Sequence, residues 1–391
     1  MKPSKNILPI IVIAQFCCTS LWFASNAVMS DLVLHFNLNP NAVSYLTSAV
    51  QFGFILGTLV FALLAVADRF SPSKVFLISA LLGAACNLGI LWDGNNLASM
   101  LSIRFLTGFF LAGIYPVGMK IAADYFEKGL GKSLGFLVGA LVLGTAFPHF
   151  LKGMTSGLPW ELVILCTAGL AILGGLMMVF LVPDGPFRKP SQGVNINAFF
   201  GIFKNKNLRT AAFGYFGHMW ELYAFWAFVP LMLKTYTSLH TETQFNIPIL
   251  SFTIIGIGGL ACVLSGYLSE SFGTKKIATI ALLLSCVCCL ISPLLFTQPS
   301  AILFIAFLLF WGMAVVADSP LLSTLVAQNA PAEVKGTALT LVNSIGFAIT
   351  IISIQLISGL QLLTNSSLIY FCLAIGPIFG LLALRQKNKR Q

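Results

Sequence analysis

Long apolar runs of roughly 20 residues alternate with short polar connections along nearly the whole chain of 391 residues. A helix needs about 20 predominantly apolar residues to cross the hydrocarbon core of a bilayer. The pattern therefore predicts an all-α membrane protein with twelve transmembrane helices and almost no soluble portion. The expected spans are residues 7–29, 41–66, 75–91, 98–122, 133–154, 160–182, 210–233, 247–269, 277–296, 300–326, 336–360 and 366–384.

Composition supports the same class of protein. The chain is 58% hydrophobic and 9% charged, with a mean hydropathy of +0.92, whereas a soluble domain carries about 25% charged residues. The net charge of +10 does not indicate a nucleic-acid partner, because 18 of the 22 Lys and Arg residues fall at the two ends of the chain or at alternate connections between spans. By the positive-inside rule these connections and both termini are cytoplasmic. We expect a multi-pass protein of a bacterial inner membrane, monomeric, with the lipid bilayer as its surroundings.

The first 27 residues resemble a secretory signal, because Lys2 and Lys5 precede an apolar core and a small-residue segment at 24–27. The apolar run continues through Val28 and Met29, which favours a first transmembrane helix over a cleaved signal.

All nine cysteines lie in apolar runs. Cys286 and Cys289 form a C-x-x-C, but no second pair or nearby histidine accompanies them, so we interpret the cysteines as small packing residues. We expect no metal and no cofactor. The absence of a Walker motif in the sequence makes ATP an unfavoured energy source.

The chain contains an internal repeat. Glu270 follows Asp68 by 202 residues, Pro320 follows Pro116 by 204, and Lys335 follows Lys132 by 203. Matches at one period of about half the chain predict two homologous bundles. The longest polar stretch lies between them and includes an amphipathic patch at 196–203, so we expect bundles at 1–182 and 209–391 joined by a cytoplasmic linker at 183–208.

The polar turn at 266–276 reads Gly-Tyr-Leu-Ser-Glu-Ser-Phe-Gly-Thr-Lys-Lys. We expect one helix to end at Gly273, where a positive φ is tolerated, and a new helix to follow. A weaker copy near Asp68 has Leu64 and Ser71 in place of the two glycines.

This turn resembles the G-x-L-x-D/E-x-x-G-x-K/R-K/R signature of the major facilitator superfamily, and Arg104 with Gly108 matches the R-x-x-x-G pattern typical of its fourth helix. The resemblance covers the whole chain. It implies a fold of six plus six helices, a central cavity lined by helices 1, 4, 7 and 10, and alternating access of the cavity to the two sides. It also implies a gating role for the two turns, through Asp68, Arg69, Lys74, Gly266, Glu270, Gly273 and Lys275.

Two acidic residues, Glu221 and Asp318, fall deep inside expected spans, where an unpaired charge costs at least about 2.5 kcal/mol. His218 precedes Glu221 by three residues and so shares its helical face, which Tyr215 extends. Glu221 and His218 could exchange protons, or Glu221 could bond to a neighbouring helix. Asp318 precedes Pro320, which can break the helix and free backbone groups for coupling, gating or an interhelical bond.

Arg104 is the deepest basic residue. Its guanidinium could hold a carboxylate with two parallel hydrogen bonds or pair with a buried acid such as Glu221. The family resemblance links it to proton coupling. Trp22 and Asn26 share a face of the first span and could line the cavity or simply pack. Lys120, near the inner end of its span, is interpreted as a residue whose charge reaches the membrane surface.

These residues favour a secondary active transporter of a small polar or anionic organic solute, coupled to protons and working by uptake. A proton-driven exporter and a ligand-sensing receptor that moves nothing remain alternatives. We do not expect an enzyme, since the sequence places no catalytic His/Asp/Ser cluster at one membrane depth.

Overall fold

The computed structural model describes residues 7–39, 41–125, 130–154, 157–188, 201–331, 335–364 and 366–385. In these residues the chain forms helices and no strand. It divides into two compact units, Met1–Gly193 and Val194–Gln391. This division falls inside the stretch 183–208 that the sequence predicts as a linker, whose amphipathic patch lies mostly outside the described residues.

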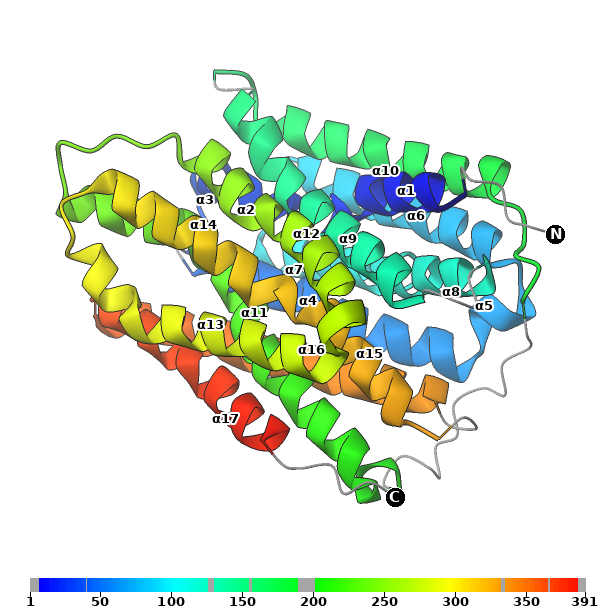
Figure 1. Ribbon diagram of the computed structural model, residues 1–391. Coiled ribbons are helices and arrows are strands. Elements are labelled where there is room, and N and C mark those ends of the chain that lie inside the picture. Colours follow the sequence, from blue (N-terminus) through cyan, green and yellow to red (C-terminus); the bar gives the residue numbers. More distant parts are fainter. Residues whose placement is uncertain are drawn as a thin grey trace. The chain divides into compact units, whose positions relative to one another are not determined.

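Unit 1 contains ten α-helices and a 3₁₀ turn among the described residues. The helices are α1 (Ile7–Thr19), α2 (Ala24–Ala27), α3 (Met29–His35), α4 (Ala42–Leu63), α5 (Val66–Arg69), α6 (Pro72–Leu88), α7 (Leu97–Leu111), α8 (Tyr115–Tyr125), α9 (Leu130–Met154) and α10 (Glu161–Leu181), with the turn η1 (Gly89–Leu91). The helix α10 packs on both α1 and α6 (Figure 1), and α1 packs on α9 as well.

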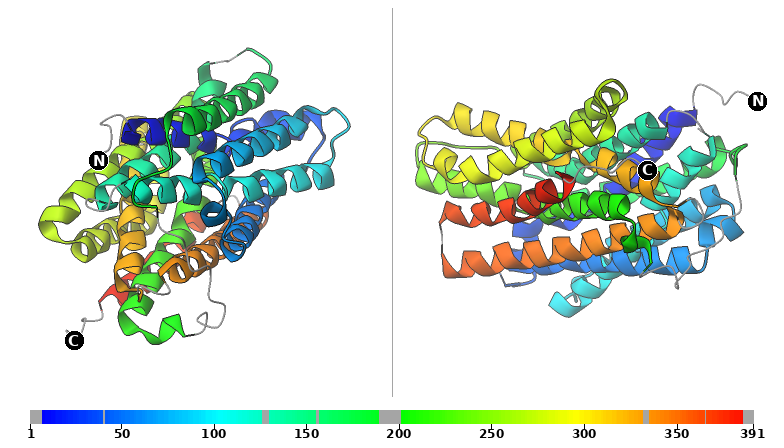
Figure 2. Two further views of the ribbon diagram at one scale, coloured as in Figure 1. Left: turned by 90° about the vertical axis from the view of Figure 1, so that its right-hand side faces the viewer. Right: turned by 60° about the horizontal axis from the view of Figure 1, so that its bottom comes forward.

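Unit 2 contains α11 (Lys206–Leu239), α12 (Ile247–Phe272), α13 (Thr274–Phe296), α14 (Ala301–Ala317), α15 (Ser319–Asn329), α16 (Lys335–Leu363) and α17 (Ile375–Leu384), with the 3₁₀ segments η3 (Ile202–Lys204) and η5 (Ser367–Ala374). The long helix α11 is central to this unit because α17, α16 and α15 all pack on it. The red helix α17 lies along the green α11 in both figures (Figures 1 and 2).

Three expected spans are interrupted. The span at 7–29 breaks at residues 20–23 and again at Val28, and α3 then occupies residues that we expected to form an outer loop. The hydroxyls of Thr19 and Ser20 bond to the carbonyls of Gln15 and Cys17, and back-bonding of this kind bends helices. Prolines explain the other two breaks.

The span at 98–122 breaks at residues 112–114, just before Pro116. The span at 300–326 breaks at Asp318, two residues before Pro320, as the sequence suggests. Each proline lacks an amide donor and its ring clashes with the carbonyl four residues earlier. The two breaks occupy matching positions in the repeat, although we had expected the earlier span to be continuous.

Ten helices or coaxial helix pairs in the described residues are long and apolar enough to cross a membrane, and α1 is a shorter apolar helix. Many large apolar side chains are exposed, including Phe180, Ile302 and Leu363. Lipid would cover such surfaces, because a bilayer supplies the apolar environment that water does not. The protein is therefore an integral multi-pass membrane protein.

Glycines allow the closest helix contacts in unit 1. A Cβ added at Gly53 would overlap the carbonyl of Phe105, and one added at Gly108 would overlap the carbonyl of Val50. The backbones of α4 and α7 therefore touch at this level, in the manner of small-residue helix interfaces in membranes. This contact holds Arg104, one turn before Gly108, beside the middle of α4.

Candidate functional site

Glu221 lies on α11 and is 1% exposed. Three hydrogen bonds end on one of its carboxyl oxygens, Oε1. Ser285 Oγ donates at 2.5 Å and Cys289 Sγ at 3.1 Å, both from α13, and Trp311 Nε1 donates at 2.6 Å from α14. The side chain thus joins three helices of unit 2 through Oε1 alone.

His218 and Asp318 form a second buried pair in the same unit. His218 Nδ1 lies 2.8 Å from Asp318 Oδ1, and both side chains are 1% exposed. The sequence places His218 beside Glu221 on one helical face, but the imidazole pairs with Asp318 instead. Tyr215, which is also buried, has its ring centroid 6.1 Å from that of His218.

Asp318 occupies the break between α14 and α15. It ends α14 and precedes the first residue of α15, and its backbone carbonyl accepts from the amides of Leu321 and Leu322. Both carboxyl oxygens are buried and neither has a hydrogen-bond partner in the described residues, so the approach of His218 to Oδ1 is an ion-pair contact. The carboxyl group therefore has one contact, to His218, and spare acceptor capacity inside the protein.

Arg104 lies on α7 in unit 1 and is 1% exposed. Its Nη1 donates to the carbonyl of Leu21 at 3.1 Å, and its Nη2 donates to the carbonyl of Trp22. The break after α1 frees these carbonyls from helical bonding, and the guanidinium satisfies them. Neither nitrogen is paired with an acid among the described residues of unit 1, and the Arg104–Glu221 pairing, which would join the two units, stays a prediction.

Trp22 and Asn26 both turn toward α4. The Trp22 ring packs on Phe54 with centroids 4.8 Å apart, and Asn26 Nδ2 donates to Thr47 Oγ1 at 2.8 Å. Both side chains are buried. Asn26 Oδ1 has no hydrogen-bond partner in the part of the chain that the structure describes.

Sequence reasoning missed several polar residues of this region. Ser285, Cys289 and Trp311 each bond to Glu221, yet in the sequence they look like ordinary members of apolar runs. Gln15 and Gln51 are fully buried in unit 1, and neither amide group has a partner among the described residues. A lone glutamine inside an apolar span is the signal that could have identified them, because burying an unpaired amide is costly.

The turn between α12 and α13 has the expected form. Gly273 has φ 90° and ψ 135°, a conformation that only glycine adopts readily, and it separates the two helices. Gly266 is buried in α12, and Glu270 is exposed and makes no ion pair within the described ranges. Lys275 is half-buried, and Lys276 lies 5.8 Å from the centroid of the Phe272 ring.

The turn between α4 and α6 has a different backbone. The left-handed residue is Ala65, with φ 49°, while Ser71, at the position of the second glycine, is extended. Lys120 Nζ lies 2.9 Å from Asp68 Oδ1 and 3.7 Å from Asp124 Oδ1. Lys120 therefore anchors the turn to α8, while Arg69 and Lys74 are exposed.

Residues 182–188 also form hydrogen bonds with this turn. Arg188 Nη2 donates to the carbonyls of Asp68 and Phe70, and Ser71 Oγ donates to Asp184 at 2.8 Å. Ser73 Oγ donates to the carbonyl of Val182 at 2.8 Å. The beginning of the expected linker is thus bound to unit 1.

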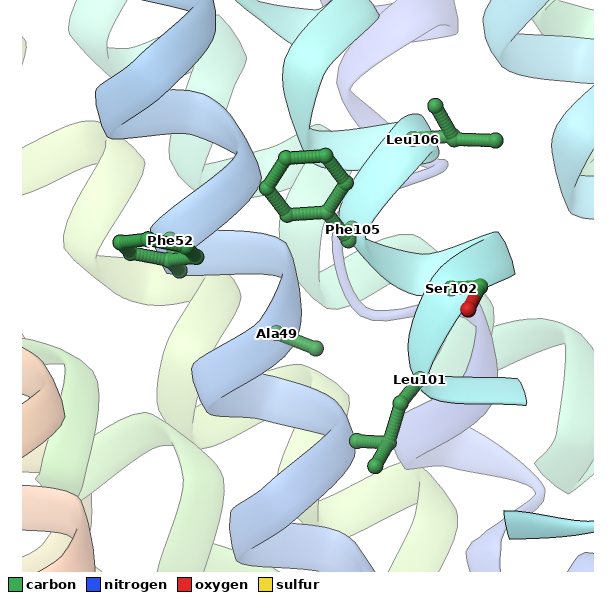
Figure 3. A pocket seen from close by; sticks show the side chains of 6 residues that line it. All are labelled: Ala49, Phe52, Leu101, Ser102, Phe105 and Leu106. Atoms are coloured by element: carbon green, nitrogen blue, oxygen red, sulfur yellow. The ribbon is translucent and has the colours of Figure 1, made fainter. Parts of the chain in front are cut away.

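A groove of about 460 Å³ opens between α4 and α7 (Figure 3). Its lining is apolar except for one hydroxyl, and it contains none of the ionisable residues described above. It suits a lipid chain better than a polar solute. The lining residues are Ala49, Phe52, Leu101, Ser102, Phe105 and Leu106.

A family model described as Major Facilitator Superfamily matches residues 11–354. The chain belongs to the Major Facilitator Superfamily. The resemblance seen in the turn at 266–276 and at Arg104 and Gly108 is therefore confirmed over residues 11–354.

Superfamily relatives of more than one kind are similar to this chain. The niacin transporter NiaP of Acinetobacter baylyi is 31% identical over 34% of this chain and 32% of its own length, and a putative niacin/nicotinamide transporter NiaP of Bacillus subtilis is 27% identical over 41% and 39%. The match thus spans about a third of the first relative and about two fifths of the second. A bicyclomycin resistance protein homolog of Haemophilus influenzae is 20% identical over 87% of this chain and 85% of its own length.

Solved superfamily structures share the whole fold. The proton:xylose symporter XylE superposes with a TM-score of 0.77 over 96% of this chain and 94% of its own, at 13% identity. The human organic anion transporter MFSD10 gives 0.76 over 98% and 100%, at 14% identity. At these identities the likeness concerns the fold, and it confirms the expected arrangement of two six-helix bundles.

Proposed function

We propose that this protein is a secondary active transporter that moves a small polar or anionic organic solute across the membrane and couples the movement to protons. Alternating access of a midplane site, with the two polar turns acting as gates, is the mechanism that the superfamily fold supports. Uptake by symport is the direction that we favour.

The main support for the proposal is a cluster of three buried ionisable side chains in unit 2. Glu221, His218 and Asp318 are each at most 1% exposed, and no Lys or Arg among the described residues of unit 2 forms an ion pair with them. If all three groups were ionised, two negative carboxylates would face one positive imidazolium, and the group would keep an unbalanced negative charge. Since an unbalanced charge at this depth is costly, the group can lower its charge by binding protons.

Each part of this group has a distinct role in the proposal. Glu221 Oε1 is held by three donors, so Oε2 is the atom that takes and releases a proton. The His218–Asp318 pair sits at the helix break, where a change of protonation changes the contact between α11 and the α14–α15 junction. A proton can in this way alter the packing of α14 and α15 on α11, and this change in packing is the proposed physical basis of coupling.

The niacin transporters suggest a first substrate class, namely small aromatic acids and their amides. Nicotinate and nicotinamide are therefore the first solutes to test. A thermal-shift panel of organic acids, amino acids, siderophores and inorganic anions would extend the search beyond them.

A second candidate function is proton-driven export. The bicyclomycin resistance homolog matches a far larger share of this chain than the niacin transporters do, and a multi-drug resistance efflux pump PmrA homolog of Lactococcus lactis is 27% identical over 66% of the chain. Those names favour efflux as the alternative direction.

The test uses purified protein in proteoliposomes with an imposed pH gradient. Solute accumulation that follows an inward proton gradient supports symport, and accumulation that follows an outward gradient supports exchange. Binding without counterflow indicates a receptor. Flux that is indifferent to the gradient in both directions would show that the coupling proposal is wrong.

A further inference from the structure

Three elements of unit 1 meet at the break in the first transmembrane span. Arg104 of α7 donates to the carbonyls of Leu21 and Trp22 in the break. Just after the break, Asn26 of α2 donates to Thr47 of α4, and Trp22 in the break packs on Phe54 of the same helix. The break is therefore enclosed by α4 and α7, which are themselves in backbone contact at this level.

Gln51 lies on the α4 face that covers this break. It follows Thr47 by four residues and precedes Phe54 by three, and both of those residues contact the segment, through Asn26 and Trp22. Residues three and four apart share one helical face. Gln51 is fully buried on this face, and both its amide oxygen and its amide nitrogen are without a partner in the described residues.

The unpaired atoms form a matched set. Gln51 Nε2 and Arg104 Nε are donors, while Gln51 Oε1 and Asn26 Oδ1 are acceptors. Each such atom costs about 1–3 kcal/mol when buried without a partner. Four of them on side chains that enclose one segment indicate a polar group that is bound there in the working protein.

We propose that Gln51, Asn26 and Arg104 bind a primary carboxamide of the transported solute, an inference that rests on the proposed transport function. A carboxamide presents one acceptor oxygen and two N–H donors on one planar group, which complements the two donors and two acceptors of the site. A carboxylate presents acceptors only, so the oxygens of Gln51 and Asn26 would face its lone pairs.

The charge of Arg104 does not require an anionic ligand. Its two terminal nitrogens already bond to carbonyls that follow the C-terminal end of α1, where the helix dipole favours a cation. Nε makes no bond in the described residues, and each terminal nitrogen keeps one further N–H, so these donors remain for the solute. The site therefore selects for a neutral amide over the matching acid.

The test measures binding by calorimetry to the full-length protein in nanodiscs. The three probes are nicotinamide, N,N-dimethylnicotinamide, which has lost both donors, and nicotinate. We expect nicotinamide to bind about tenfold or more tightly than either of the others, the loss that one or two missing hydrogen bonds produce. Gln51→Met should lower the nicotinamide affinity about tenfold and change the affinity for the dimethyl compound by less than about threefold.

Gln15→Met is the matched control. Gln15 is also a fully buried glutamine of unit 1 with an unpaired amide, but its oxygen lies against Gly118 of α8 instead of the break. It should leave nicotinamide binding within about twofold, since it removes no hydrogen bond to the solute. Thermal unfolding of each variant reports whether it is folded.

Equal affinities for the three probes, tighter binding of nicotinate, or no binding of nicotinamide would overturn the inference and assign the polar atoms to buried water. Loss of nicotinamide binding in both glutamine variants would overturn it as well. Gradient-driven flux in the wild-type protein is a separate readout, so either proposal can fail while the other stands.

Discussion

Replacing Glu221 by glutamine or by alanine separates two roles of this side chain. One is to accept hydrogen bonds from neighbouring helices, and the other is to bind a proton. Glutamine retains an oxygen that can occupy the Oε1 position and accept from Ser285, Cys289 and Trp311, but it cannot take up a proton. Alanine removes the acceptor altogether. Neither variant can bind a proton at this position, but the two variants should differ in stability.

The size of the difference follows from the donors. In Glu221→Ala the Trp311 indole loses its partner in a fully buried position, and the Ser285 hydroxyl must find another acceptor. A buried donor left unpaired costs about 1–3 kcal/mol, so the loss in the free energy of unfolding is about 2–5 kcal/mol. In Glu221→Gln the bonds persist with a neutral acceptor, which weakens each by about 1 kcal/mol or less.

The assay pairs unfolding in detergent with flux in proteoliposomes. We expect Glu221→Gln to unfold at a clearly higher temperature than Glu221→Ala and yet to lose gradient-driven flux as completely. Trp311→Phe, which removes one donor and keeps a smaller aromatic ring, is the control for the loss of a single hydrogen bond. Undiminished gradient-driven flux in Glu221→Gln would refute the role of Glu221 in proton transfer, and equal stability of the two Glu221 variants would refute the structural role of Oε1.

Three further predictions concern other parts of the site. Asp318→Asn removes the charge that pairs with His218, so gradient-driven flux should fall about tenfold or more while solute counterflow persists; a parallel loss of both would indicate a packing role instead. Gly273→Ala should slow turnover and cost about 1–3 kcal/mol of stability, and the cost comes from the positive φ alone because nothing lies within 4 Å of the added Cβ. Gly359→Ala, equally open but helical, should leave turnover unchanged and not lower stability; matching turnover in the two variants would show that the turn is passive. Asp68→Asn should lower stability by no more than about 1 kcal/mol, since its pairing with Lys120 is partly exposed; a larger loss in thermal unfolding would contradict this.

The parts of the fold that local chemistry determines were accessible from the sequence. The lengths of the apolar runs predicted the spans, the glycine at 273 predicted the left-handed turn, and Pro320 predicted the break at Asp318. The break in the first span has no proline or glycine. It depends on hydroxyls that bond back to the helix and on Arg104, whose partners are backbone carbonyls that a sequence does not display.

The candidate site was predictable only in its ionisable members. Glu221, His218 and Asp318 are conspicuous because a charge in an apolar run is rare. Their pairings were not accessible, since the partners of Glu221 lie 64 to 90 residues away and His218 could face either acid. Gln51 went unnoticed because its importance depends on the absence of a partner, which only the folded helices reveal.

Proton movement during solute transport tests the central claim most directly. A pH-sensitive dye inside proteoliposomes would record the internal pH while a gradient of the transported solute is imposed, with no initial pH difference. We predict that the solute gradient drives a pH change in the wild-type protein and none in the double variant Glu221→Gln, Asp318→Asn. A pH change of the same size and rate in the double variant would contradict the account, because protons would then move without the buried carboxyl groups of unit 2.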